Sequence, residues 1–326
     1  MQEFNIIKKY FLPLACHKSA YHLQNDVAKI SVPSGYQLVV SKDMMVENVH
    51  FLKQDGGYKI ASKLLLSNLS DLASSGAKPL HYMLGFSKNH SLDDNFLQQF
   101  SLGLGDVQKK FKISLIGGDT VSADNLVFSI TIFGITKNIL HRNKAQEQDL
   151  IFVSGNIGDA GLGLILNQQS QSTLPSYTKK LLQAHFFPTP QIALGYNLSK
   201  LKLSKTAIDV SDGLLADLQH LCNNSNLDAH IFFDTIPIST SAKKFLAENK
   251  QRNPLHLLAS GDDYQLIFAV KPKNQQKILD LSKKLRLNVS CIGFFSKKSQ
   301  DQAKVLLFNN SITSKPIFYQ KTGYQH

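Results

Sequence analysis

The chain alternates short apolar runs with longer segments of helical periodicity along most of its 326 residues. Such alternation is typical of α/β and α+β proteins. We expect a short buried strand at residues 38–40, a half-buried strand at 126–133, and a buried helix at 60–75. Further strands are expected at residues 81–86, 114–116, 151–153, 207–208, 230–233, 265–270 and 289–292, and further helices at 92–111, 160–167, 177–184 and 192–201.

A polar stretch at residues 142–149 separates two sets of such elements. We therefore expect two domains, an N-terminal one at residues 1–143 and a C-terminal α/β domain at residues 144–326.

Composition excludes several classes of protein. Apolar residues make up 43% and charged residues 18% of the chain, as in folded globular proteins. No apolar run approaches the roughly 18 residues of a membrane-spanning helix, so no membrane partner is expected. The three cysteines are far apart and odd in number, which argues against a disulfide framework and is consistent with a cytoplasmic protein.

The formal net charge of +12 is compatible with either a nucleic-acid partner or an anionic small substrate. The basic residues occur as scattered pairs, such as Lys109-Lys110 and Lys283-Lys284, without interleaved aromatic residues. This scatter is typical of solvated helix faces, so we do not expect nucleic-acid binding, although charge alone does not decide the question.

Carboxylates follow short apolar runs or glycine turns at several places, namely at Asp43, Asp119, Asp209, Asp212, Asp262 and Asp263. Taken singly, each can be a turn residue or a helix cap, and Asp212 can cap a helix that begins at Gly213. Together they suggest a ligand site, because strand ends in α/β sheets collect ligands. Clustered carboxylates repel one another unless cations bind, and hard oxygen ligands favour Mg²⁺ or Ca²⁺. Several carboxylates with several Mg²⁺ ions suit a polyphosphate.

Asp71 belongs to the predicted helix at residues 60–75, which is apolar almost all round. Asn68 lies one turn before it, and the segment contains no arginine. A buried charge costs several kcal/mol unless it is paired or bound to metal. Asp71 is therefore a second type of candidate ligand.

The usual nucleotide motifs are absent. The chain has no GxxxxGK[ST] loop, no HRD or DFG element and no GxSxG elbow. The glycine-rich segment at residues 154–163 follows a predicted strand without GxGxxG spacing, so a structural turn is favoured over a phosphate contact. His50, which follows the first carboxylate loop, is a candidate ligand-binding residue.

Six blocks occur in one order along the chain: residues 24–28 (QNDVA), 41–51 (beginning SKD, ending HF), 68–79 (beginning NLSDLA, ending GAKP), 117–120 (GGDT), 209–214 (DVSDGL) and 260–264 (SGDDY). With these blocks the sequence resembles the thiamine-monophosphate kinase family, within the aminoimidazole-ribonucleotide-synthetase-like superfamily. The resemblance covers nearly the whole chain.

The resemblance implies a two-domain fold of the α/β (α+β) class, whose N-terminal mixed sheet pairs with a second copy into the barrel of a homodimer. It implies that ATP phosphorylates thiamine monophosphate directly to thiamine diphosphate with several Mg²⁺ ions. Mg²⁺ would be bound by Asp26, Ser41, Asp43, Asp71, Asp119, Asp209 and Asp212, of which Asp43, Asp71, Asp119 and Asp209 are the expected catalytic set. ATP would contact Gly118, Asp119, Arg142 and Ser211, and thiamine monophosphate would contact His50, Asp262 and Tyr324.

Three positions depart from the family pattern. Asn25 replaces the first of two paired aspartates, Lys42 replaces a serine or threonine, and Asp262 replaces a glutamate. Alternatives therefore include another ATP-using member of the superfamily, and a decayed nucleotide-binding or basic nucleic-acid-binding protein without turnover.

Overall fold

The computed structural model describes residues 2–89, 92–169, 175–313, 315–319 and 323–324. The chain forms two compact units, one comprising Met1–Leu72 and Ala77–Lys137, the other Ala73–Gly76 and Asn138–His326. The domain boundary expected at residues 143/144 stays a prediction.

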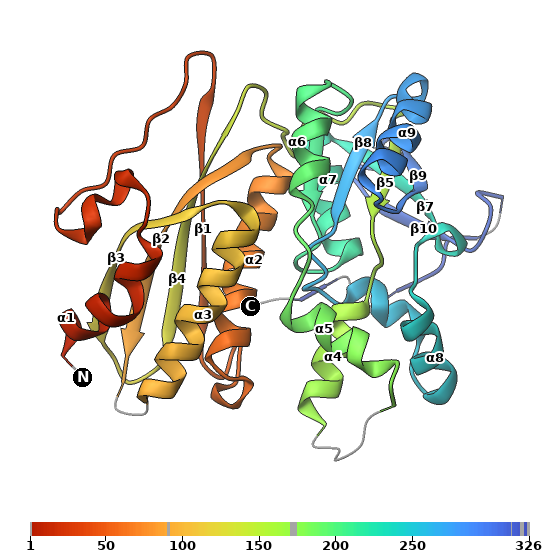
Figure 1. Ribbon diagram of the computed structural model, residues 1–326. Helices are drawn as coiled ribbons and strands as arrows, with labels where there is room; N and C mark the ends of the chain where they lie inside the picture. The colour runs from red at the N-terminus through yellow and green to blue at the C-terminus, as the bar shows by residue number, and fades with distance from the viewer. Residues whose placement is uncertain (1, 90–91, 170–174, 314, 320–322, 325–326) are drawn as a thin grey trace. The chain divides into compact units, whose positions relative to one another are not determined.

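The first unit contains a four-stranded mixed sheet and two long helices (Figure 1). The strand order is β1-β4-β2-β3, with β2 and β3 parallel and the other pairs antiparallel. Its elements are α1 (Glu3–Ile6), η1 (Ile7–Phe11), η2 (Leu12–Leu14), η3 (Lys18–Leu23), β1 (Gln37–Val46), η4 (Lys53–Asp55), α2 (Gly57–Ser74), β2 (Lys78–Lys88), α3 (Asp94–Phe111), β3 (Ser114–Ser122) and β4 (Val127–Thr136).

Helix α2 is buried on nearly every side, as its sequence predicts. The helix stops at Gly76, whose φ of +70° closes the last turn at a position that favours glycine. Aromatic side chains fill the core of the unit, where the Phe100 ring of α3 lies 4.7 Å from that of Phe128 of β4. The predicted buried helix is confirmed.

The expected buried strand at residues 38–40 is wrong in two respects. Strand β1 is ten residues long, and Leu38 and Val40 are 41% and 53% exposed. The reason is its place in the sheet, because β1 lies at an edge and pairs with β4 alone among the described strands. Strand β4 was expected to be half-buried, but most of its residues are buried because it lies between β1 and β2.

The second unit contains a six-stranded mixed sheet in the order β10-β7-β9-β5-β8-β6. Its core includes the stacked rings of Phe152 and Phe268, with centroids 5.7 Å apart. Its elements are β5 (Leu150–Ser154), α4 (Asp159–Gln168), α5 (Thr178–Phe186), α6 (Ile192–Lys200), β6 (Thr206–Asp209), α7 (Leu214–Ser225), β7 (Leu227–Phe232), η5 (Phe233–Thr235), α8 (Thr240–Glu248), η6 (Pro254–Ala259), β8 (Leu266–Val270), η7 (Pro272–Asn274), α9 (Gln275–Leu285), β9 (Val289–Lys297) and β10 (Val305–Phe308).

In the part of the chain that the structure describes, no helix is long and apolar enough to cross a lipid bilayer.

We expect His81 of β2 to make the free energy of unfolding depend on pH in the acidic range. Its ring lies 4.6 Å from the ring of His17, and its Nδ1 has no hydrogen-bond partner among the described residues. Burial, and then the neighbouring His17, lower the pKa of His81 from 6.5 to about 4. The unfolded chain therefore binds more protons between these values, and stability is lost as the pH falls from 6.5 toward 4.

We expect urea unfolding at pH 7 and pH 4.5 to show a smaller loss of stability for His81→Phe than for the wild type. Phenylalanine keeps an aromatic ring beside His17 and cannot titrate. Equal losses in the two proteins would show that His81 does not account for the pH dependence.

Candidate active site

In the first unit, a cluster of polar and acidic side chains lies where the edge strand β1 contacts helix α2. The Ser41 hydroxyl donates a 2.6 Å hydrogen bond to Oδ2 of Asp71, and the backbone N–H of Asp43 donates a 3.1 Å bond to Oδ1 of Asn68. Asn68 is fully buried, and its Nδ2 donates to the carbonyl of Leu64 one turn earlier. Asn68 thus fixes β1 against α2, and this contact places Ser41 and Asp43 beside the helix that carries Asp71.

Lys42 does not belong to this group. Side chains alternate along a strand, and burial in β1 alternates accordingly, with positions 41 and 43 partly buried and position 42 exposed. The ammonium group therefore lies on the face of β1 opposite to Ser41 and Asp43.

His50 lies in the turn after β1. Its backbone N–H donates to the carbonyl of Val46 at 2.9 Å, and its Nδ1 accepts from the N–H of Val46 at 3.1 Å. Because Nδ1 is an acceptor, a neutral His50 carries its proton on Nε2.

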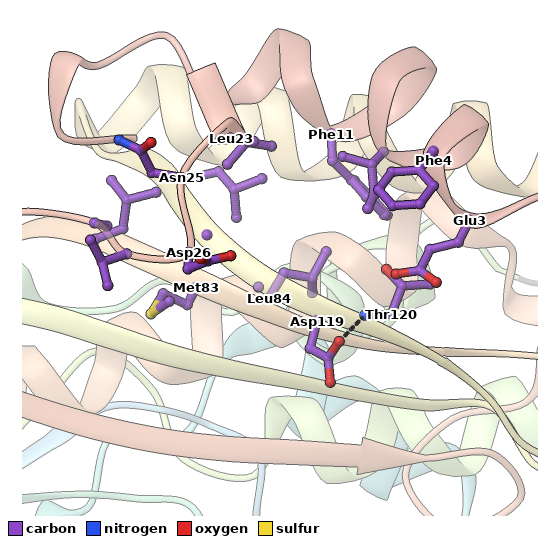
Figure 2. Close-up of a pocket in the computed structure, with 17 residues that line it drawn as sticks. Glu3, Phe4, Phe11, Leu23, Asn25, Asp26, Met83, Leu84, Asp119 and Thr120 are labelled. Carbon is purple, nitrogen blue, oxygen red and sulfur yellow. Dashed lines mark hydrogen bonds between the residues drawn. The ribbon is translucent and has the colours of Figure 1, made fainter. Parts of the chain in front are cut away.

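A pocket of about 390 Å³ lies beside β3 in the same unit (Figure 2). Asp26 and Asn25 line it from the segment after η3, and Gly118 and Asp119 line it from the strand. The Asp119 carboxylate also accepts the N–H of Thr120 at 2.9 Å. The pocket therefore brings together Asp26, Gly118 and Asp119, residues to which the family resemblance assigns Mg²⁺ and ATP.

Asp43 and Asp119 are not at strand ends, contrary to expectation. Asp43 lies within β1 and Asp119 within β3, because both strands are longer than their apolar runs. The register runs from Asp43 to Ile130, Leu84 and Gly118 across the four strands. Three strand spacings of about 4.8 Å separate the two edges by about 14 Å, too far for one ion to bind both carboxylates in one chain.

In the second unit, candidate ligands meet in the turn between β6 and α7. Asp209 ends β6 as predicted, and Ser211 and Asp212 follow it. One carboxylate oxygen of Asp217, a residue that sequence reasoning missed, accepts the N–H groups of Ser211, Asp212 and Gly213 at 3.0, 3.1 and 3.1 Å. Asp212 does not cap α7, because the N-cap residue is Gly213 and, among the described residues, no side chain bonds to the first N–H groups of the helix.

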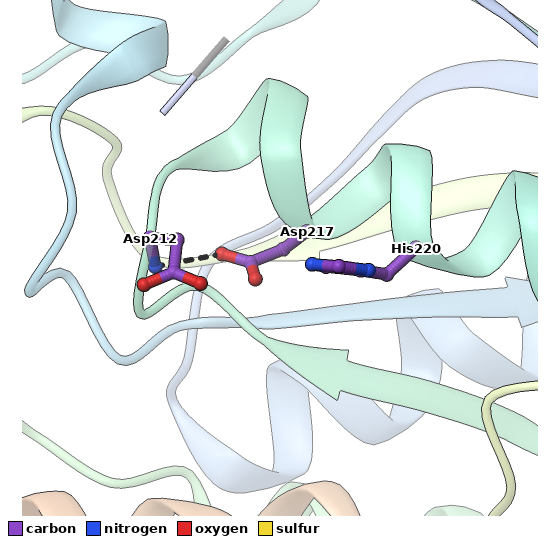
Figure 3. Close-up of side chains that lie close together, drawn as sticks. All are labelled: Asp212, Asp217 and His220. Carbon is purple, nitrogen blue, oxygen red and sulfur yellow. Dashed lines mark hydrogen bonds between the residues drawn. The ribbon is translucent and has the colours of Figure 1, made fainter. Parts of the chain in front are cut away.

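Asp217 is buried, and Figure 3 shows it between Asp212 and His220. Burial, and then the carboxylates of Asp209 and Asp212, raise the pKa of Asp217 to about 8 against the lowering effect of its backbone hydrogen bonds. One ligand atom each of Asp212, Asp217 and His220 lies within 4.8 Å of the others. Two carboxyl groups and an imidazole ring therefore lie close together at this turn.

The loop at residues 261–264 and the C-terminal segment contact the same turn. Asp262 donates its N–H to the carbonyl of Ser211, and Tyr324 donates its N–H to the carbonyl of Asp212, both at 2.9 Å. The Asp262 carboxylate accepts from the Tyr264 hydroxyl at 3.2 Å and lies 3.7 Å from Nδ1 of His185. The structure thus joins Ser211, Asp212, Asp262 and Tyr324, four residues predicted for the site from distant parts of the sequence.

Arg142 is exposed at the start of the second unit, next to the bridge between His141 and Thr206. Its backbone carbonyl accepts a 3.4 Å hydrogen bond from the Ser225 hydroxyl.

The glycine-rich segment at residues 154–163 leads into helix α4. The buried carboxyl group of Asp263 accepts the N–H groups of Gly158 and Ala160 at 2.6 and 3.2 Å. Burial raises the pKa of Asp263 well above its ordinary value, although these hydrogen bonds favour the anion. Two N–H donors at the start of α4 are therefore occupied by a side chain, which supports the structural interpretation of this segment.

Family models of known proteins match the sequence in both halves of the chain. Residues 24–136 match the family model described as AIR synthase related protein, N-terminal domain, and residues 146–305 match the model of the corresponding C-terminal domain. The chain is 36% identical to the thiamine-monophosphate kinase of Haemophilus influenzae over 306 residues, which cover 92% of this chain and 91% of that protein. The chain belongs to the thiamine-monophosphate kinase family.

The thiamine-monophosphate kinase of Buchnera aphidicola subsp. Schizaphis graminum is 35% identical to this chain, and the match covers 99% of this chain and 98% of that protein. The crystal structure of the kinase from Stenotrophomonas maltophilia has a TM-score of 0.79 at 33% identity, covering 88% of this chain and 90% of that one. A solved complex of AaThiL with AMPPCP and TMP shares the fold, with a TM-score of 0.77 at 24% identity over 96% of both chains. The expected family and two-domain fold are confirmed.

Proposed function

We propose that this protein transfers the γ-phosphoryl group of ATP to the phosphate of thiamine monophosphate. A bond forms between the γ-phosphorus and a phosphate oxygen of the acceptor, the bond to the β-phosphate oxygen breaks, and ADP leaves with thiamine diphosphate as product. The observation that carries the proposal is the joining of Ser211, Asp212, Asp262 and Tyr324 at one turn, in a chain of this family.

The donor chemistry of the site fits Mg²⁺. Ser41, Asp43 and Asp71 offer oxygen atoms where β1 meets α2, and Asp26 with Asp119 offers two carboxylates to the pocket. We propose that these residues, with Asp209 and Asp212 of the second unit, hold several Mg²⁺ ions. Bound Mg²⁺ neutralises phosphate charge and orients the phosphate groups.

The protein side chains have mainly to bind and position two anions. The attacking phosphate oxygen is already anionic at neutral pH, so no strong general base is required. We assign ATP to Gly118, Asp119, Arg142 and Ser211, and thiamine monophosphate to His50, Asp262 and Tyr324. Nε2 of His50 is a donor in the neutral ring, and the net charge of +12 attracts both substrates.

We further propose that the active site is shared by two copies of the chain. The exposed face of the edge strand β1 carries Leu38, Val40 and Met44, which are 41%, 53% and 51% exposed, together with the exposed Lys42. Pairing of two sheets along such edges buries apolar surface. It also offers Asp43 and Asp71 of one copy a partner sheet that carries Asp26 and Asp119, whereas Asp43 and Asp119 of the same chain are too far apart to share one ion.

The purified protein, incubated with ATP, thiamine monophosphate and Mg²⁺, should release ADP and thiamine diphosphate in equal amounts. Omission of either Mg²⁺ or thiamine monophosphate should abolish ATP turnover. ATP turnover without thiamine monophosphate would indicate another reaction of the superfamily, and nucleotide binding without turnover would indicate a decayed enzyme.

A further inference from the structure

The backbone N–H and carbonyl groups of the turn at residues 210–213 are hydrogen-bonded to two different sets of residues. On one side, Asp217 Oδ2 accepts the N–H groups of Ser211, Asp212 and Gly213. On the other side, the carbonyls of Val210, Ser211 and Asp212 accept the N–H groups of Tyr264, Asp262 and Tyr324 at 2.8, 2.9 and 2.9 Å. The turn therefore has little freedom to move alone.

Close packing restricts the same contact further. A Cβ atom placed on Gly261 would lie 2.0 Å from the carbonyl oxygen of Ser211, so only glycine fits there without movement. The C-terminal segment also packs closely, because a Cβ atom on Gly323 would lie 2.7 Å from the carbonyl oxygen of Asp212.

Residues with different proposed roles are thus fixed by one turn. In the proposed function, the side chains of Ser211 and Asp212 bind ATP and Mg²⁺. Asp262 and Tyr324 are assigned to thiamine monophosphate, and their backbone N–H groups donate to the carbonyls of those same two residues. A displacement of the turn must move both binding surfaces.

We infer that Asp217 is a positioning residue that sets the binding geometry for both substrates through this turn. Asp217 is only 2% exposed, and the carboxylate oxygen described above faces the backbone, so it acts through the turn and not by touching a substrate. The inference rests on the proposed function.

The chain offers a matched control in Asp228 of β7. Its carboxylate is 1% exposed and accepts three hydrogen bonds at 2.8 Å, from the N–H and hydroxyl of Ser299 and the N–H of Lys304. Strand β7 is separated from β6, which leads into the turn, by β9, β5 and β8. Asp228 thus has the burial and bonding of Asp217 without its connection to the turn.

The experiment measures steady-state kinetics with ATP and thiamine monophosphate varied in turn, for Asp217→Asn, Asp217→Ala and Asp228→Asn. Hydrogen–deuterium exchange of the amides of residues 211–213 is followed in the same full-length proteins. Asparagine keeps an acceptor oxygen for the turn, so we expect graded effects. Asp217→Asn should raise both KM values about two- to fivefold, and Asp217→Ala about tenfold, with faster amide exchange in the same order.

Asp228→Asn should lower the unfolding midpoint and leave both KM values within about twofold of the wild type. The inference is overturned if Asp217→Asn exchanges faster at residues 211–213 while both KM values stay unchanged, or if only one substrate is affected. It is also overturned if Asp228→Asn raises both KM values equally. A wild type that forms no thiamine diphosphate would instead refute the proposed function.

Discussion

An Asp71→Asn variant is expected to lose about a thousandfold or more in turnover while keeping its stability in the absence of Mg²⁺. Asparagine has the shape of aspartate and can still accept the hydrogen bond from Ser41, but it lacks the charge proposed to bind metal. It also removes repulsion between Asp71 and Asp43. The unfolding free energy without Mg²⁺ should therefore stay within about 1 kcal/mol of the wild-type value, or rise.

The measurements are turnover at saturating Mg²⁺ and urea unfolding in the presence of EDTA. Asp106→Asn serves as the control, because the exposed carboxylate of Asp106 in α3 likewise accepts a hydroxyl hydrogen bond, from Tyr58 at 2.8 Å. The control should keep wild-type turnover. A clear loss of metal-free stability in Asp71→Asn would instead make Asp71 a structural residue.

Mixing two inactive variants should restore activity if the site is shared between copies. Asp71→Asn and Asp119→Asn chains are each expected to form inactive homodimers. In a mixed dimer, one site combines both defects, and the other combines the intact Asp119 of the first chain with the intact Asp71 of the second. Random mixing makes half of the dimers mixed, so about a quarter of wild-type activity should return.

Subunit exchange is achieved by mild denaturation and refolding of the mixture, with each variant treated alone as the control. A mixture of Asp71→Asn with Asp43→Asn tests the geometry further, because both defects lie in the same proposed half-site and no activity should return. Recovery in that second mixture, or none in the first, would contradict the shared site.

The sequence was sufficient to predict features that depend on local patterns. Apolar residues on nearly all sides of α2 predicted that the helix is buried, and Gly76 marked its end. The apolar run before Asp209 and the glycine after Asp212 likewise marked two residues that lie close together in the turn between β6 and α7. The exposure of β1 was not predictable from its apolar run, because an edge position depends on which strands pair with it.

The structural roles of Asp217 and Asp263 required the folded chain. Asp217 lies four residues after Gly213, at a spacing where an acidic residue in the first turn of a helix can reach back to the preceding N–H groups. That spacing was the available signal. Asp263 reaches the start of α4 from more than a hundred residues away, so no local pattern reveals it. Helices α8 and α9 were missed because they are rich in polar residues, and strand β10 was missed because it is only four residues long.

The buried carboxylate of Asp263 has a consequence for recognising enzymes of this kind. A glycine-rich loop followed by a helix offers N–H groups that can bind a phosphate, yet here two of these N–H groups already donate to the carboxyl group of Asp263. A nucleotide phosphate could bind these N–H groups only by displacing the Asp263 side chain. A glycine-rich segment before a helix therefore indicates a phosphate site only when the N–H groups at the start of that helix are not already bound by a side chain of the protein.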